Sequence, residues 1–223
     1  MPNYSTYLVA GPENILPNHQ LGNESKEQAL IRIVQELSNN GLNVFQLRAK
    51  NISDSEQIDI LRNLKKALLN TQTKICINDS VNVASRAGDF VDILHLGQSD
   101  MHPEKAKSFI NDRIKIGLSI TKESQTRNIP DCVSYIGVGP IYKTNSKNDA
   151  EKPIGETILK QILEKVHIPV VAIGGINLNN VSKLFSLGVS GVAVISNILN
   201  NENPLQNFLL LKEKIKKGLN FCI

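Results

Sequence analysis

The sequence predicts an α/β protein that folds as a single-domain (β/α)8 barrel, also called a TIM barrel, over residues 1–223. Short apolar runs rich in Val and Ile recur along the chain, and several are nearly continuous, which is typical of parallel strands covered on their outer face. Helix-like stretches lie between these runs, and 223 residues are close to the least that eight such units require. A doubly wound open sheet is the alternative, because an alternation of strands and helices does not show whether the sheet closes.

The expected strands are the apolar runs themselves. In chain order they cover residues 7–10, 44–48, 74–77, 93–96, 115–120, 135–141, 169–173 and 189–195. Segment 11–24, with its prolines and asparagines, is expected to be a long loop after the first strand. No linker or shift in composition divides the chain, so a single domain is expected.

The first two helices are indicated by apolar periodicity together with signals at their ends. The first has apolar residues at helical spacing, namely Leu30, Ile33, Val34 and Leu37. Gly41 is placed to end it in a left-handed conformation. A capping box of Ser53 and Glu56 begins the second helix, because the Glu56 side chain can reach back to the Ser53 amide. Its apolar face consists of Leu61, Leu64 and Leu68.

The second half of the chain carries three further helical patterns. One is an apolar stripe made by Ile158, Ile162 and Val166. Asn177 is expected to cap a helix that carries Val181 and Leu184 and ends at Gly188. Residues 205–218 are expected to form a final helix with a lysine-rich outer face. The segments after strands three, four and five are shorter, and their helical patterns are weaker.

Composition excludes several classes of protein. With 41% hydrophobic and 21% charged residues, the chain is neither a fibre nor a disulfide mini-protein, and no apolar run approaches the roughly 20 residues that span a membrane. A net charge of +4 does not by itself indicate nucleic acid, and the lack of Trp argues against stacking on single strands. The odd, widely spaced cysteines and an N-terminus without a signal-peptide pattern favour a reduced, cytoplasmic protein. The three cysteines are Cys76, Cys132 and Cys222.

In a barrel, function is expected where strands end and the following loops begin. The second strand ends with Gln46, Arg48 and Lys50 on one face, because side chains alternate along a strand. Two cations so close repel each other unless a polyanion such as a phosphate or diphosphate lies between them. The alternative is that both pair with carboxylates or extend into solvent.

The third and fourth strands end near carboxylates. Asn78 and Asp79 follow the third strand, and Asp100 follows the fourth, so an oxygen-ligand Mg²⁺ site is expected there. The alternative is helix capping, by Asp79 and Ser80 for one helix and by Asp100 for the next. Arg48 and Lys50 lie on the neighbouring strand end. A metal–diphosphate site accounts for these two cations and for the carboxylates together, whereas helix capping accounts for the carboxylates alone.

A second anion site is expected after strands seven and eight, where barrels commonly hold a phosphate. Gly174 and Gly175 follow strand seven, and Ser196 follows strand eight. The loop after strand six offers hydroxyls, an amide and two lysines across residues 142–147. An ordinary turn and an ordinary polar loop are the alternatives.

The histidines give no sign of a base or nucleophile. His19, His102 and His167 are expected at the surface, and His95 as a hydrogen-bonded histidine within the fourth strand. Cys76 is expected to be a small core residue. The residues themselves therefore indicate an enzyme that joins or splits two phosphorylated small molecules.

The ordered set of strand-end motifs resembles the thiamine phosphate synthase family along nearly the whole chain. The motifs are Gln46-Leu47-Arg48-Ala49-Lys50, Ile77-Asn78-Asp79, His95-Leu96-Gly97-Gln98-Ser99-Asp100, Gly117-Leu118-Ser119-Ile120-Thr121, Gly137-Val138-Gly139-Pro140-Ile141-Tyr142 with Thr144 and Lys147, Ile173-Gly174-Gly175-Ile176 and Val194-Ile195-Ser196. The resemblance implies a (β/α)8 barrel that joins 4-amino-2-methyl-5-hydroxymethylpyrimidine diphosphate to 4-methyl-5-(2-phosphooxyethyl)thiazole. It also implies that thiamine phosphate and diphosphate are the products, with one Mg²⁺ per subunit.

The resemblance also implies a role for each matching residue. The set expected to bind the pyrimidine diphosphate is Gln46, Leu47, Arg48, Ala49, Lys50, Asn78, Ser119 and Lys147. Of these, Arg48, Lys50, Ser119 and Lys147 are expected to be catalytic, and Asp79 and Asp100 to hold Mg²⁺. The set expected to bind the thiazole phosphate is Thr144, Asn145, Ser146, Gly175, Ile195 and Ser196. In the family mechanism diphosphate leaves first and the thiazole nitrogen captures the resulting cation, so no general base is needed.

Some positions depart from the family pattern. Ala49 stands where an acidic residue is frequent, Lys143 where Pro is usual, and Ser146 where Thr is frequent, while Gly11 and Pro12 open an unusual first loop. Two alternatives stay open: a thiazole tautomerase-like relative and a non-catalytic sensor of a phosphorylated ligand. Neither requires the diphosphate and metal residues. No nucleic acid or membrane partner is expected, and a homo-oligomer is left open.

Overall fold

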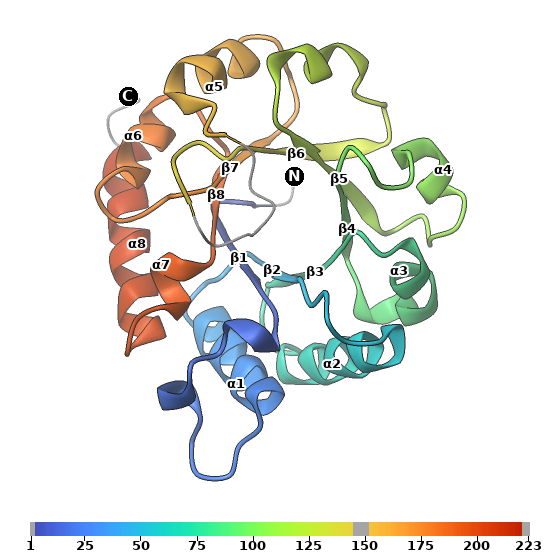
Figure 1. Cartoon of the computed structure of the whole chain (residues 1–223), viewed down its shortest axis with the longest axis vertical. Coiled ribbons are helices and arrows are strands. Elements are labelled where there is room, and N and C mark those ends of the chain that lie inside the picture. The colour runs from blue at the N-terminus through green and yellow to red at the C-terminus, as the bar shows by residue number, and fades with distance from the viewer. Residues whose placement is uncertain (1–2, 145–151, 220–223) are drawn as a thin grey trace.

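Eight parallel strands close into a barrel in the order in which they occur along the chain (Figure 1). The computed structural model describes residues 3–144 and 152–219. The strands are β1 (Thr6–Ala10), β2 (Val44–Leu47), β3 (Lys74–Asn78), β4 (Ile93–Leu96), β5 (Lys115–Ile120), β6 (Val133–Val138), β7 (Val170–Ile173) and β8 (Gly191–Val194). Pairing of Leu8 in β1 with Val194 in β8 completes the closure, so the barrel prediction is confirmed and the open sheet is wrong.

Helices of very different length surround the barrel (Figure 1). The α-helices are α1 (Lys26–Asn39), α2 (Asp54–Ala67), α3 (Val81–Ala87), α4 (Pro103–Lys107), α5 (Gly155–Leu163), α6 (Val181–Ser186), α7 (Ser196–Leu199) and α8 (Pro204–Leu219). The 3-10 turns are η1 (Pro12–Asn14), η2 (Pro17–His19), η3 (Gly88–Phe90) and η4 (Glu123–Asn128). The connection after β5 is η4 alone, in agreement with the weak helical pattern there. Among the described residues, no helix combines the length and apolarity that crossing a membrane requires.

The predicted end signals of α1 and α2 are confirmed. Gly41 follows α1 with a φ of +89°, the left-handed region that glycine adopts without steric cost. Ser53 caps α2 by accepting a hydrogen bond from the Glu56 amide (3.3 Å), and the Glu56 carboxylate accepts one from the Ser53 amide (2.8 Å). Both signals are confirmed because they depend only on residues within one helical turn.

Two predicted helix ends were wrong. Asn177 does not cap α6: its carbonyl accepts from the amides of Asn180 (3.2 Å) and Val181 (3.1 Å), which makes a separate turn, and Asn180 is the residue before the helix. Val166 is not part of the α5 stripe, because α5 ends at Leu163 and the chain must extend before Pro169 to enter β7.

Side chains from the barrel strands divide between two cores. The larger core lies between the sheet and the helices and includes Leu8 and Phe45. The smaller core fills the barrel and includes Tyr7, Val9 and Val44. On β1 and β2, successive residues therefore alternate between the two cores, as strand geometry requires. This alternation determines which residues at the strand ends face the barrel axis.

The loop after β1 is docked against the other end of the chain. His19 was expected at the surface, but it is 5% exposed and its Nε2 is 2.8 Å from the Asn201 carbonyl oxygen in the α7–α8 connection. Arg32 of α1 donates to the His19 carbonyl (2.6 Å) and pairs with Glu24 (2.9 Å). The prediction of a surface His19 was wrong because two of its partners, Asn201 and Arg32, lie 182 and 13 positions away along the chain.

The capping box of α2 provides a test of the local contribution to stability. Ser53→Ala should lower the free energy of unfolding by about 1 kcal/mol, because the Glu56 amide loses its acceptor at the exposed start of the helix. Urea unfolding measures the change. Ser55→Ala is the matched control in the same first turn and should stay within about 0.5 kcal/mol of the wild type. Equal losses in the two variants would contradict the capping role.

Candidate active site

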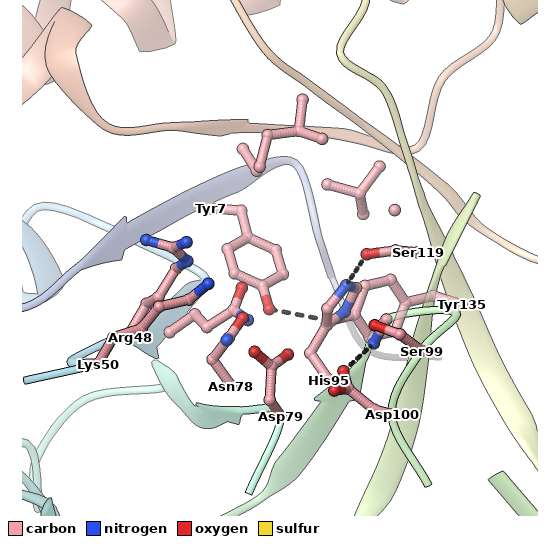
Figure 2. A pocket seen from close by; sticks show the side chains of 16 residues that line it. Tyr7, Arg48, Lys50, Asn78, Asp79, His95, Ser99, Asp100, Ser119 and Tyr135 are labelled. Atoms are coloured by element: carbon pink, nitrogen blue, oxygen red, sulfur yellow. Dashed lines mark hydrogen bonds between the residues drawn. The ribbon is translucent and has the colours of Figure 1, made fainter. Parts of the chain in front are cut away.

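A cavity of about 290 Å³ lies inside the C-terminal end of the barrel (Figure 2). Its walls come from strand ends and the loops that follow them. The lining includes seven residues that the sequence singled out, namely Gln46, Arg48, Lys50, Asn78, Asp79, Asp100 and Ser119. The barrel therefore brings together residues that are up to 73 positions apart in the sequence, from Gln46 to Ser119.

The end of β2 sends alternate side chains to opposite faces. Gln46 is buried, and its Nε2 donates to Asn78 Oδ1 on β3 (2.8 Å). Arg48 and Lys50 continue the same face and line the cavity. Leu47 and Ala49 pack into the outer core, so their side chains point away from the cavity, although Ala49 borders an adjoining cleft beside Asp79. The face that carries Gln46, Arg48 and Lys50 is the one predicted from the period of two.

The two carboxylates do not cap helices. Ser80, not Asp79, caps α3 by accepting from the Val83 amide (3.1 Å). Asp100 accepts from the Gly97 amide (2.6 Å) within its own loop, and α4 begins later, at Pro103. The capping alternative is therefore wrong for Asp79 and Asp100, whereas its Ser80 part is confirmed. Asp79 also has a φ of +61°, the one positive φ of a non-glycine residue among those that the structure describes.

The surroundings of Asp79 disfavour its charged form. Partial burial, with the nearby Asp100 carboxylate as the next cause, raises the pKa of Asp79 to about 6. Lys50 and Arg48 oppose this rise but do not cancel it. A divalent cation between the carboxylates would remove the repulsion, and oxygen ligands suit Mg²⁺. In residues 3–144 and 152–219, no three His, Cys, Asp or Glu residues group as metal ligands.

Aromatic hydroxyls and a histidine form the floor of the cavity, and sequence reasoning missed most of them. Tyr7 OH lies 2.8 Å from Tyr135 OH, which lies 2.8 Å from His95 Nδ1. His95 Nε2 lies 2.9 Å from Ser119 Oγ, so the predicted hydrogen-bonded His95 is confirmed. The available signal was the presence of tyrosines at inward positions of otherwise aliphatic strands. Burial raises the pKa of Tyr7 and Tyr135 well above the ordinary value, so both hydroxyls stay protonated.

A second cavity of about 500 Å³ lies at the ends of β7 and β8. Of the residues predicted there, Thr144, Gly175 and Ser196 line it. Ile195 packs against the inner core instead. Three further predicted residues, Asn145, Ser146 and Lys147, lie outside the described residues. Four asparagines of this lining were not predicted, namely Asn177, Asn197, Asn200 and Asn201.

Gly175 allows two loops to approach each other beside this second cavity. Its φ is +66°, and a Cβ at this position would lie 2.6 Å from the Lys143 carbonyl oxygen and 2.7 Å from Tyr142 Cβ. Tyr142 is held in turn by a hydrogen bond to Glu156 (2.8 Å), which also pairs with Lys183 (2.6 Å). A side chain at position 175 would therefore displace the segment that carries Thr144.

Solved structures share this architecture. Thiamine phosphate pyrophosphorylase from Pyrococcus furiosus superposes with a TM-score of 0.82 at 27% identity, with 98% of each chain covered. Thiamine phosphate pyrophosphorylase from Bacteroides thetaiotaomicron superposes with a TM-score of 0.64, covering 97% of this chain and 98% of the other, but at 17% identity it supports the fold alone.

Sequence comparison points to the same family. Thiamine-phosphate synthase of Lactococcus lactis subsp. cremoris (strain SK11) is 33% identical over 218 residues, which are 96% of each chain. That of Clostridium tetani (strain Massachusetts / E88) is 38% identical over 179 residues, covering 80% of this chain and 84% of the other. Residues 19–198 match the model of the family described as thiamine monophosphate synthase. With relatives this similar over nearly the whole length and a barrel that carries the predicted strand-end residues, the chain belongs to the thiamine monophosphate synthase family.

Proposed function

We propose that this chain condenses 4-amino-2-methyl-5-hydroxymethylpyrimidine diphosphate with 4-methyl-5-(2-phosphooxyethyl)thiazole, forming thiamine phosphate and releasing diphosphate. One observation carries the proposal: two cations face two carboxylates inside one cavity at the C-terminal end of the barrel (Figure 2). A diphosphate with a divalent cation complements both pairs of charges at once. Membership of the family supports the same reaction.

The cations are proposed to bind and stabilise the diphosphate. Arg48 and Lys50 approach from β2, with Gln46 and Asn78 holding the neighbouring wall through their mutual hydrogen bond. Lys147 is proposed to add a third cation from the loop after β6, by its match to the family motif. These charges favour the transition state because negative charge grows on the leaving diphosphate.

Asp79 and Asp100 are the residues proposed to hold one Mg²⁺. When bound, the ion would supply positive charge to the oxygens of the departing diphosphate. Partial burial and the nearby Asp100 carboxylate raise the pKa of Asp79, and this supports the assignment, because a cation bound between the two carboxylates would offset the cost of their charges.

The thiazole phosphate is proposed to occupy the second cavity. Thr144 and Ser196 offer hydroxyls there, and Gly175 exposes its main chain where the chain turns out of β7. Asn145 and Ser146 are included from the family motif, and Ile195 through its place beside Ser196. The two cavities share the same end of the barrel, so the two substrates can meet.

The proposed chemistry requires positioning and charge rather than proton transfer. The bond between the pyrimidine methylene carbon and the diphosphate oxygen breaks first, and the electron pair leaves with the oxygen. The lone pair of the thiazole nitrogen then forms the new carbon–nitrogen bond, and no proton has to be removed. Alignment of the two substrates by the barrel end supplies much of the acceleration. We also propose a cytoplasmic location, which the free thiols of Cys76 and Cys132 support.

The direct test is product formation. The purified chain is mixed with both substrates and Mg²⁺, and thiamine phosphate and diphosphate are followed by chromatography. Equal amounts of both products are expected with Mg²⁺ and almost none after chelation of the metal, because the leaving charge is then poorly neutralised. Absence of product under both conditions would contradict the proposal and favour the tautomerase-like or sensor alternatives.

Asp79→Asn should separate stability from activity. The variant removes one negative charge beside Asp100, and Asn tolerates the positive φ at this position. In metal-free buffer its free energy of unfolding should therefore rise by about 1 kcal/mol, a value that allows for solvent screening of the charge. The folded-state pKa of Asp79 is raised, so its charge lowers stability as pH rises, and the gain should vanish below about pH 4. The value of kcat/KM should fall by about a hundredfold.

Asp112→Asn is the matched control, because Asp112 is almost fully exposed and is not one of the residues that line the cavity. It should change neither stability nor activity measurably. Activity close to the wild type in Asp79→Asn would contradict the metal assignment.

Gly175→Ala should act on the thiazole substrate alone. The added methyl group would displace the Lys143 carbonyl, so the KM for the thiazole phosphate should rise by about tenfold while the KM for the pyrimidine diphosphate changes little. Steady-state kinetics in each substrate measure the split. Gly22→Ala is the control: Gly22 also has a positive φ (+56°) but open space around it, so it carries the backbone strain without the collision. Equal changes in both KM values for Gly175→Ala would count against this second site.

A further inference from the structure

Four side chains form a continuous row of hydrogen bonds across the floor of the first cavity (Figure 2). They come from four strands: Tyr7 from β1, Tyr135 from β6, His95 from β4 and Ser119 from β5. The successive distances are 2.8 Å, 2.8 Å and 2.9 Å. Ser119 ends the row at the cavity, and the reaction as proposed above gives Tyr7, Tyr135 and His95 no task.

Glycines on β5 and β6 leave room for the rings of Tyr135 and His95. A Cβ at Gly117 would lie 2.3 Å from the Tyr135 ring and 2.6 Å from His95 Nδ1, and one at Gly137 would lie 3.0 Å from His95 Cε1. Tyr4 stacks on the Tyr135 ring, with ring centroids 4.5 Å apart. Two glycines and one stacked ring therefore fix the rings of Tyr135 and His95.

The order of acidity decides how protons are arranged along the row. A neutral imidazole carries one N–H, and its other nitrogen accepts a hydrogen bond. A phenol is a far stronger acid than a neutral imidazole N–H, so the favoured arrangement has the Tyr135 hydroxyl donating to His95 Nδ1 and accepting from Tyr7. The single hydrogen of His95 is then on Nε2 and is donated to Ser119 Oγ. With that lone pair of Ser119 engaged, its own O–H is left to point into the cavity.

We propose that Tyr135, assisted by Tyr7, is a positioning residue that holds His95 in the Nε2–H tautomer and thereby presents Ser119 as a hydrogen-bond donor to the substrate. The acceptor class is an unprotonated ring nitrogen of a planar heterocycle. This inference rests on the proposed function for the identity of that heterocycle, the pyrimidine. It assigns the row to ring recognition, separate from the charge neutralisation at Asp79, Asp100 and the cations.

The first experiment compares matched Tyr→Phe variants by steady-state kinetics. Tyr135→Phe should lower kcat/KM for the pyrimidine diphosphate by about tenfold, the effect of one misdirected hydrogen bond, with the KM for the thiazole phosphate unchanged. Tyr7→Phe should cost no more than about threefold, because Tyr135 still donates to His95 without it. Tyr4→Phe is the control: it stacks on the same ring, and its buried hydroxyl has no hydrogen-bond partner among the described residues. It should retain activity.

The second experiment asks whether Tyr135 acts through Ser119. In a Ser119→Ala background, Tyr135→Phe should have less than about a twofold effect, because the donor that it directs is already gone. The same tenfold loss in both backgrounds would overturn the proposal and indicate direct substrate contact or a structural role. Thermal melting of every variant identifies any that are unfolded.

The third experiment is independent of catalysis. NMR of isotope-labelled histidine nitrogens, at a pH where the ring is neutral, should show a protonated Nε2 for His95 in the unliganded wild type and a mixture of tautomers in Tyr135→Phe. His95→Gln identifies the signal among the four histidines. A protonated Nδ1 in the wild type would overturn the proposal even if Tyr135→Phe fails to fold. A wild type that makes no thiamine phosphate but has the Nε2–H tautomer would instead refute the proposed function alone.

Discussion

Closure of eight parallel strands sends every second side chain of each strand into one enclosed space, and the rest of the molecule depends on this alternation. On β2 it puts Phe45 and Leu47 against the helices and Gln46 into the barrel. Arg48 and Lys50 continue the inward set past the end of the strand, where both line the cavity. Polar residues thus gather at one end of a barrel whose outer face is packed with aliphatic side chains, and that end is where a substrate can be bound.

The site holds interactions that oppose folding. Asp79 has a backbone conformation that most side chains avoid, and its carboxylate is partly buried near that of Asp100, so its pKa rises. Helix capping would relieve neither feature, since Ser80 already caps α3. Such a cost persists when the surrounding fold is stable enough to impose it, and the hydrogen-bonded strands on both sides of β3 provide that support. A bound cation would turn the same arrangement into a favourable one.

The interior of this barrel is unusual in its reliance on tyrosine. Three of them, Tyr4, Tyr7 and Tyr135, fill space that aliphatic side chains usually occupy, and glycines on β5 and β6 make room for their rings. A buried hydroxyl is costly unless it is hydrogen-bonded, so Tyr7 and Tyr135 bond to each other and onward to His95. The tyrosine rings therefore fill the barrel, and the hydroxyls of Tyr7 and Tyr135 also form the hydrogen-bonded row across the floor of the cavity. The fixed partners of these two hydroxyls keep that floor rigid.

The sequence by itself determined the strands, the capping box of Ser53, the single face of Gln46, Arg48 and Lys50, and the family motifs. These follow from contacts within a few residues or from the period of two, which every strand obeys. Closure of the sheet and the burial of His19 were decided only by the tertiary structure. So was the meeting of Tyr7 with Tyr135, which are 128 positions apart. Each of these depends on segments that meet although they lie far apart along the chain, and local patterns carry no record of such a distant partner.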